Sequence, residues 1–336
     1  MAISSFPMIS QLRLLNGVDN ELSQEQILKL WEFYNLLSGS TNSKFILRGE
    51  SDRNLTRQFN VDSHNPNLLA ECLFMTGVKG RICWEENGGY DPDDTSNENF
   101  LNICSSLIKY IDDGIKSGGN HAKRLKTFCD KNEDFYMGIK NETALVEAYE
   151  KLEYEDKRKV NLYYLAIAHT INDREYRDFS TFISTTTNAR VADYFAKDVI
   201  IYGWVPKTIW KSSAKRRTIE HVVINDKFTI MNTGLPYCNV SVFPNQEEIA
   251  IRCGLLSHFI IGFAIENDFY VNPAVFTAID TMHELRSFKE LSAYRRGIQL
   301  RGLNINQENF EDFCRRTNFK RYYTFDEEVY TMHKVR

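Results

Sequence analysis

Three short segments of the sequence combine side-chain types that could hold an anion and act on a bond beside it. In "FILRG", Arg48 and Gly49 end an apolar run, and in "STFISTTT" hydroxyl side chains fill positions 184–186. In "FPNQEEIAI", Gln246 stands two residues before Glu248. The planar guanidinium fork of arginine suits a diphosphate, and alternate residues of a strand share a face. We therefore expect Gln246 and Glu248 to point together into one cleft, with the residue between them facing away.

Taken in order, these segments resemble the mono-ADP-ribosyltransferases of the Arg-Ser-Glu type, a group that includes C3-like exoenzymes, binary actin-modifying toxins and pierisin-like DNA modifiers. The first motif of that family is an Arg-Gly pair at the end of an apolar strand, and the second is aromatic-x-Ser-Thr-Ser/Thr. The third has a Gln or Glu two residues before a catalytic Glu, with an aromatic residue three positions earlier. The matching residues are Arg48 and Gly49, then Phe182, Ser184, Thr185 and Thr186, then Phe243, Gln246 and Glu248.

The resemblance implies that NAD is a substrate and that no metal is needed. Glu248 would stabilise the oxocarbenium-like state that forms as nicotinamide leaves the ribose, since a carboxylate is worth more there than in the ground state. Ser184 would hold that carboxylate or the ribose, and Gly49 would bring its backbone close to the nicotinamide amide. The implied catalytic residues are Arg48, Ser184, Gln246 and Glu248. The implied NAD-binding residues are Arg48, Gly49, Ser184, Thr185, Thr186 and Phe195, and the implied acceptor-binding residues are Phe243 and Gln246.

Gln246 also bears on the acceptor that would receive ADP-ribose. Arginine-modifying relatives have Glu at this place, whereas an amide offers both a donor and an acceptor to another amide or to a nucleobase edge. Positions 286–336 carry eleven Lys and Arg against seven Asp and Glu, interleaved with Tyr. Because Arg and Tyr can contact phosphate and stack on bases, we favour a nucleic-acid base in RNA or DNA as the acceptor. A protein side chain (Asn or Gln before Arg), bare NAD hydrolysis and a non-catalytic NAD-binding module are the alternatives.

The elements that must position these residues change in type along the chain. Positions 23–37 have a Ser cap, a Gln three residues on and helical apolar spacing, and positions 45–47 predict a strand buried on both faces. Residues 52–178 are mostly helical in pattern, and residues 179–281 contain short Val-, Ile-, Phe- and Tyr-rich strands, "KFTIMNTG" among them. Helices followed by strands predict an α+β fold.

The resemblance further implies an ADP-ribosyltransferase-like core of two packed, antiparallel-rich β-sheets, with a large helical N-terminal part. The expected domains are a catalytic domain over residues 1–281 and a basic, mixed and largely helical extension over residues 282–336. Thr187 or Asn188 is expected to cap a helix that includes Phe195, and His169 in "LAIAHTI" is expected to pack within its helix. The acidic loop at 91–94 lacks the Gly and the Glu of an EF-hand, so no metal site is predicted.

The composition restricts the class of protein. The 336 residues are 43% hydrophobic with a net charge of −4, which excludes a disordered chain and gives no overall attraction to nucleic acid or membranes. Dinucleotide-fold, P-loop, zincin and serine-hydrolase motifs are absent, and seven cysteines without a CxxC pair predict reduced, mostly buried thiols. No leader or long apolar run is found. We therefore expect a cytoplasmic protein without membrane contact, acting as an intracellular toxin in a toxin-antitoxin or phage-defence setting, with a neutralising protein as a further partner.

Overall fold

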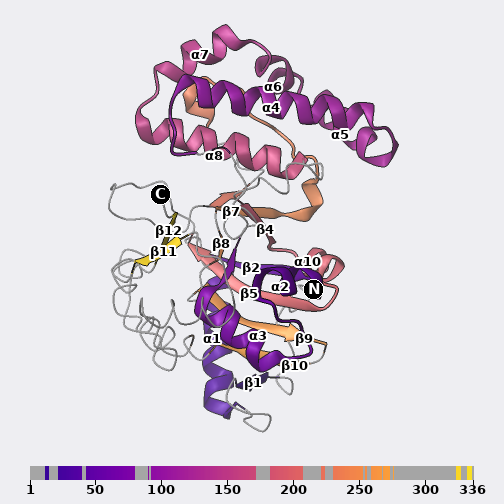
Figure 1. The fold of residues 1–336 in the computed structure, drawn as a ribbon, viewed down its shortest axis with the longest axis vertical. Helices are drawn as coiled ribbons and strands as arrows, with labels where there is room; N and C mark the ends of the chain where they lie inside the picture. Colours follow the sequence, from indigo (N-terminus) through magenta and orange to yellow (C-terminus); the bar gives the residue numbers. More distant parts are fainter. Residues whose placement is uncertain are drawn as a thin grey trace. The chain divides into compact units, whose positions relative to one another are not determined.

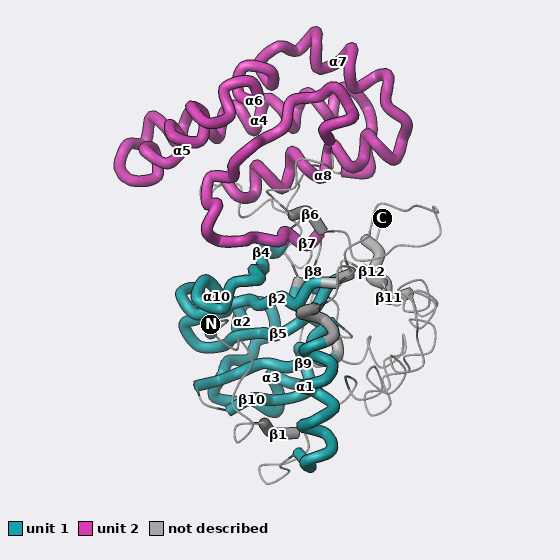
Figure 2. The backbone as a smooth tube through the Cα atoms, turned by 180° about the vertical axis from the view of Figure 1, so that it is seen from behind, with its two compact units in different colours: residues 1–85, 183–220, 253–336 teal, residues 86–182, 221–252 magenta. Residues whose placement is uncertain are grey.

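The chain divides into two compact units, each assembled from separate stretches of sequence (Figure 2). Unit 1 comprises residues 1–85, 183–220 and 253–336, and unit 2 comprises residues 86–182 and 221–252. The computed structural model describes residues 12–14, 22–39, 43–79, 90, 92–171, 182–206, 221–223, 230–252, 254–255, 259–266, 268–272, 275, 323–326 and 331–334. Helices and strands occur together in both units, which confirms the α+β prediction.

Unit 1 contains a sheet of short apolar strands (Figure 1). In the described part of the unit, the strands pair in the order β1 (Leu12–Leu14), β10 (Asp268–Val271), β9 (Ile260–Ile265), β5 (Val199–Pro206), β2 (Ser43–Glu50) and β4 (Phe182–Thr186). Neighbouring strands are antiparallel, except that β1 runs parallel to β10. β2 lies between β5 and β4, and its apolar residues at 45–47 are all buried, as the continuous apolar run predicted.

Three of the four described helices of unit 1 begin at a side-chain cap, at Ser23, Asn65 and Asn188. These four helices are α1 (Gln24–Gly39), α2 (Asp52–Phe59), α3 (Pro66–Thr76) and α10 (Ala189–Phe195). The Ser23 hydroxyl accepts from the Gln26 amide at 3.2 Å, and the Gln26 side chain accepts from the Ser23 amide at 2.9 Å, which confirms the predicted capping box. α1 and α10 pack against β2, and α3 packs against β9. A short pair, β3 (Val78–Lys79) with β8 (Gly254–Leu255), adds two antiparallel strands.

Unit 2 is mainly helical, as the pattern over residues 52–178 predicted (Figure 1). Its helices are α4 (Asn97–Lys116), α5 (Gly119–Lys131), α6 (Glu133–Gly138), α7 (Glu142–Glu150) and α8 (Tyr154–Ile171). α8 is the central helix, since nearly every residue from 160 to 171 is buried. Phe100 of α4 stacks on Tyr149 of α7 with ring centroids 4.0 Å apart, and it also packs on Tyr164 of α8. Because Tyr164 meets Phe135 of α6 edge-on, aromatic packing joins α4, α6 and α7 to α8.

The chain from Ile230 to Val242 is held against these helices by buried polar side chains. Asn132, only 2% exposed, accepts from the amides of Asn239 and Val240 and donates to the Val240 carbonyl at 2.9 Å. The hydroxyls of two α8 residues add bonds to the same stretch, at Pro236 and Cys238. This anchored chain leads into the 3₁₀ turn Pro244–Gln246 and then into β7 (Glu248–Arg252), which pairs with β6 (His221–Val223).

Two of the secondary-structure predictions were wrong where they can be compared. The described part of "KFTIMNTG" is a 3₁₀ helix, Met231–Thr233, because the Thr233 hydroxyl bonds back to the Ile230 carbonyl at 2.7 Å and Gly234 takes a left-handed φ of 73°. In the extension predicted to be largely helical, the described residues form an antiparallel pair, β11 (Tyr323–Asp326) with β12 (Thr331–Lys334). The other residues of the basic extension, 282–322, 327–330 and 335–336, lie outside the described residues.

Four of the seven cysteines lie within the described residues, where their burial can be compared with the prediction of buried thiols. Free thiols occur at Cys72, Cys104, Cys129 and Cys238, of which all but Cys129 are buried. Burial, helped by neighbouring carboxylates, raises the pKa of Cys129 to about 11, so the thiol stays protonated at neutral pH. The remaining cysteines, Cys83, Cys253 and Cys314, lie outside the described residues.

Within the described chain, no helix has the length and apolar character needed to cross a bilayer.

Candidate functional site

Arg48, near the end of β2, is held by three contacts within unit 1. Its Nε and Nη2 each lie 2.6 Å from Glu50 Oε1, and its Nη1 donates a 2.6 Å hydrogen bond to the Ser184 carbonyl oxygen. Glu50 is 4% exposed, and its second oxygen accepts from Asn54 at 3.1 Å. Arg48 therefore joins β2 to β4 and compensates a buried carboxylate, which sequence reasoning did not foresee. We call Arg48, Glu50 and Ser184 the arginine cluster.

Gly49 is needed for packing against α10. A Cβ at this position would overlap the backbone nitrogen of Ala196 and would lie 2.5 Å from the Ala192 carbonyl oxygen and 2.6 Å from the carbonyl carbon of Phe195. No side chain larger than hydrogen fits there, so glycine lets β2 approach the C-terminal end of the helix. The close approach of α10 is sufficient to explain why residue 49 is glycine. The expected contact of its backbone to nicotinamide stays a prediction.

The hydroxyl residues of β4 differ in exposure. Ser184 is exposed, whereas Thr185 and Thr186 are 3% and 5% exposed. The Thr186 hydroxyl accepts from the Asn188 amide at 3.0 Å, and the Asn188 side chain caps α10 by accepting from the amide two residues on. Of the two predicted caps, Asn188 is the one that forms, and Thr186 supports it. Ser184 is therefore the hydroxyl of this motif with the most solvent-accessible side chain.

Two aromatic residues predicted to contact ligands lie at helix or turn ends. Phe195, the last residue of α10, is 49% exposed and meets the ring of the more exposed Tyr194 edge-on, with centroids 5.2 Å apart. Phe243 is half-buried in unit 2, where the Arg124 guanidinium lies 5.3 Å from its ring centroid. The Phe243 carbonyl accepts from the Gln246 amide at 3.0 Å, so it also closes the turn that carries Gln246.

Gln246 and Glu248 do not share a strand, contrary to prediction. Gln246 ends the 3₁₀ turn, Glu247 takes a left-handed φ of 47°, and Glu248 is the first residue of β7. Pro244 fixes the start of the turn. The strand does not extend back to residue 246 because the left-handed backbone at Glu247 interrupts the extended conformation. Glu247 is exposed. The direction of the Gln246 side chain is thus set by a turn and not by strand alternation.

Glu248 is contacted at both carboxylate oxygens by consecutive residues of α8. Thr170 Oγ1 lies 3.2 Å from Glu248 Oε2, within hydrogen-bonding distance, and His169 Nε2 lies 3.5 Å from Glu248 Oε1. The Glu248 and His169 side chains are 9% and 11% exposed. The His169 ring also packs on Phe182, with centroids 5.9 Å apart. We call His169, Thr170 and Glu248 the glutamate cluster.

The sequence reading missed the part that His169 and Thr170 play. His169 was expected to pack inside its helix, and it does so, but one edge of its ring faces the carboxylate. The sequence signal for this role was the adjacent pair His169-Thr170 near the end of the apolar run "LYYLAIAHTI", in the part of α8 that is mostly buried. A buried polar pair requires partners, although the sequence alone does not say which.

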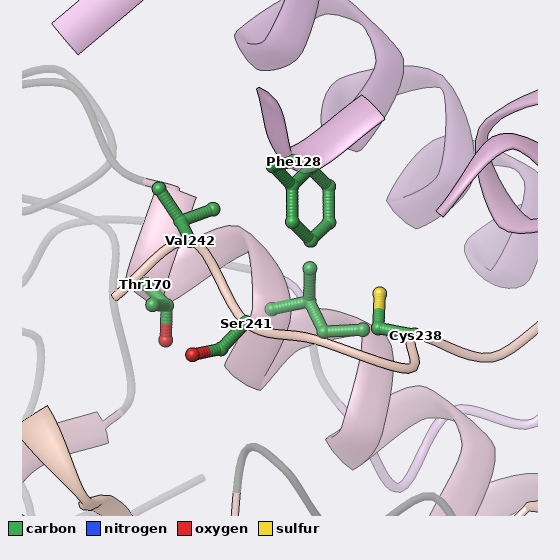
Figure 3. A pocket seen from close by; sticks show the side chains of 6 residues that line it. Phe128, Thr170, Cys238, Ser241 and Val242 are labelled. Atoms are coloured by element: carbon green, nitrogen blue, oxygen red, sulfur yellow. The ribbon is translucent and has the colours of Figure 1, made fainter. Parts of the chain in front are cut away.

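A small pocket in unit 2 adjoins the glutamate cluster (Figure 3). It is lined by Phe128, Ile167, Thr170, Cys238, Ser241 and Val242. The lining is mostly apolar, with hydroxyls at Thr170 and Ser241. Thr170 therefore belongs both to this pocket and to the set of residues that contact Glu248.

Asp93, in the loop considered for calcium, is bound by two guanidinium groups of unit 2. Arg158 Nε lies 2.6 Å from one carboxylate oxygen, and Arg252 Nη2 lies 2.9 Å from the other. Burial raises the pKa of Asp93, but the hydrogen bonds and charges of Arg252 and Arg158 outweigh burial and lower it to about 2. Across the described residues no group of three metal-ligating side chains is found.

The predicted site residues thus fall into two clusters, each described within its own unit. The arginine cluster gathers Arg48 and Ser184, and the glutamate cluster contains Glu248, with Gln246 in the preceding turn. Compared with protein-family models, curated proteins and solved structures, the chain gives no significant match.

Proposed function

We propose that this protein is a mono-ADP-ribosyltransferase that cleaves the bond between nicotinamide and ribose in NAD and transfers ADP-ribose to an acceptor. An ADP-ribosyltransferase-like core of two packed sheets is part of the proposal. The observation that carries it is the Glu248 carboxylate, nearly buried, with one oxygen on the Thr170 hydroxyl and the other beside His169. An oriented carboxylate out of bulk water interacts strongly with a developing oxocarbenium charge, because water reorganises little around it.

Arg48 and Ser184 supply the part of the proposal that concerns NAD binding. Among the residues that the structure describes, the contacts to Glu50 and to the Ser184 carbonyl use three of the five guanidinium N–H groups of Arg48, and in the proposed enzyme the other two bind a diphosphate oxygen. The exposed Ser184 side chain is two residues from Phe182, which packs on His169. In the proposed enzyme, Arg48 binds the diphosphate while it keeps the β4 backbone in place.

The proposed acceptor is a nucleic-acid base. Gln246 supports this choice because its amide can pair with a nucleobase edge, and it lies at the end of a turn closed by the Phe243 carbonyl. The basic composition of residues 286–336 supplies phosphate contacts in this proposal. Phe243 and Gln246 would together present an aromatic face and an amide to the acceptor.

The test uses NAD labelled in its adenylate part, incubated with the full chain and with separate RNA, DNA and protein fractions. We expect label to enter RNA or DNA with the wild-type chain and with Glu247→Gln, but not with Glu248→Gln. The Glu247→Gln variant is the matched control, because it makes the same chemical change one residue earlier at an exposed side chain. Label in protein alone would overturn the acceptor, and label in no fraction with no nicotinamide release would overturn the transferase itself.

A further inference from the structure

β7 and α8 are joined at both ends of β7 within unit 2. Glu248 begins β7 and contacts the last turn of α8, while Arg252 ends β7 and binds Asp93. Asp93 in turn binds Arg158, which lies in the first turns of α8. The strand from Glu248 to Arg252 spans about 14 Å at ~3.4 Å per residue. The helix from Arg158 to His169 spans about 17 Å at 1.5 Å per residue.

The strand and the helix segment differ in length by only about 3 Å, which the Asp93 side chain can span between Arg252 and Arg158. β7 is therefore held in register along α8 by an ion-pair bridge at one end and by the Glu248 contacts at the other. The helix itself is fixed, because Asn161 accepts from the Tyr149 hydroxyl and donates to the carbonyls of Pro92 and Asp94. To move Glu248 along α8, the protein would have to break the Asp93 ion pairs or the hydrogen bonds of Asn161.

We propose that Thr170 and His169 are positioning residues for the Glu248 carboxylate, a role that rests on the proposed function. Thr170 fixes the direction of Oε2 by a hydrogen bond, and His169 places an imidazole nitrogen beside Oε1. With both oxygens contacted, rotation about the last side-chain torsion of Glu248 is restricted. The carboxylate then keeps one orientation toward the ribose, which is the geometric requirement for stabilising the transition state more than the ground state.

The Thr170 hydroxyl gives this arrangement a further property. Its oxygen lies 3.1 Å from the Ala166 carbonyl and 3.2 Å from Glu248 Oε2, and both partners accept when Glu248 is ionised. A hydroxyl has one proton to donate. Thr170 must therefore share it between the two acceptors, or turn it from the backbone carbonyl toward the carboxylate. The hydrogen bond from Thr170 to Glu248 becomes stronger when the carboxylate carries its full negative charge. The Thr170 hydroxyl can therefore adjust its donation to Glu248.

The position beside the C-terminal turn of α8 makes such donors necessary. The carbonyl end of a helix carries a partial negative charge that opposes a nearby anion. A hydroxyl and an imidazole N–H offset that effect locally. Removing either donor is therefore expected to lower the rate of bond cleavage while leaving the binding of NAD, through the arginine cluster, unchanged.

The experiment measures nicotinamide release and the NAD KM for two matched pairs of variants in the full chain. Thr170→Val removes the hydroxyl and keeps the shape, whereas Thr170→Ser keeps the hydroxyl. His169→Phe keeps a ring against Phe182 and removes the nitrogen, whereas His169→Gln keeps an N–H near the place of Nε2. We expect kcat to fall about tenfold or more in the Val and Phe variants, with KM unchanged, and to recover within about threefold in the Ser and Gln variants.

A second arm repeats Thr170→Val on the Glu248→Gln background, where we expect no additional loss of the residual rate, because residues that act through one group are not additive. Equal kcat in Thr170→Val and wild type would overturn the positioning role, as would an equal further loss on the Glu248→Gln background. If nicotinamide release depends on Glu248 but is unaffected by the Thr170 and His169 substitutions, this inference is overturned while the proposed function stands. No release by the wild-type chain would overturn the proposed function and this inference together.

Discussion

Each of the two clusters holds a carboxylate that is at least nine-tenths buried, but the partners differ in kind. Glu50, 4% exposed, is met by the guanidinium of Arg48, two residues away on the same strand. Glu248, 9% exposed, receives a hydroxyl and an imidazole from a helix 78 residues away. A guanidinium compensates the charge of its partner, whereas a hydroxyl orients a carboxylate without cancelling its charge. The first arrangement suits a structural ion pair, and the second suits a carboxylate that must act on a developing cation.

The comparison predicts a large loss of stability when the arginine cluster loses one member and a small change when the glutamate cluster does. Arg48→Met leaves Glu50 buried without its cation, and we expect the free energy of unfolding to fall by about 3 kcal/mol or more, because an uncompensated buried charge is costly. Glu248→Gln should change it by less than about 1 kcal/mol. Chemical denaturation of both variants checks this prediction. The double variant Arg48→Met, Glu50→Leu should regain part of the loss, and a single variant as stable as wild type would contradict the structural role of Arg48.

Substitution of Gly49 tests the packing of β2, the strand that carries Arg48, against the end of α10. Gly49→Ala forces a methyl group into the backbone at the end of α10, and we expect a loss of about 1–3 kcal/mol of unfolding free energy. Gly234→Ala is a useful control, because that glycine has a left-handed φ of 73° but open space around its Cα, so its cost comes from conformation alone. Thermal denaturation of the two variants separates the effects. A fully stable Gly49→Ala protein would show that α10 does not approach β2 this closely.

The smallest expected effect concerns the ion-pair bridge between β7 and α8. The pKa of Asp93 is lowered from 3.8 to about 2, so its contribution to stability is present above about pH 4 and is lost as pH falls toward 2. The side chain is 38% exposed, so solvent screening limits the contribution to below about 1 kcal/mol. We therefore expect Asp93→Asn to lower stability slightly at about pH 5 and to match wild type near pH 2, as measured by urea denaturation. A constant difference across this range would contradict the assignment.

The sequence predicted individual elements better than it predicted how the site is held. The β2 strand, the capped α1 helix and the cap at Asn188 depend on neighbouring residues, and local patterns carry that information. The pairing of Glu50 with Arg48 depends on side-chain direction within one strand, and the partners of Glu248 depend on contacts across 78 residues of the chain. The prediction failed at the turn at residues 244–246, because strand alternation was assumed across Glu247, whose left-handed backbone separates Gln246 from β7. The packing role of Gly49 was also missed, because the helix that needs glycine there lies about 140 residues further along the sequence, whereas its contact to nicotinamide stays a prediction.

The most direct test of the account is the rate of nicotinamide release from NAD by the full chain and by two variants that differ by one position. We predict that Glu248→Gln lowers the rate by about 10²–10³-fold, in the range measured when one preorganised electrostatic group is removed from an enzyme. Glu247→Gln should retain the wild-type rate, and all three proteins should have similar unfolding midpoints. Equal rates for Glu248→Gln and wild type, or no release by any of the three, would contradict the central claim that Glu248 is the carboxylate of an NAD-cleaving site.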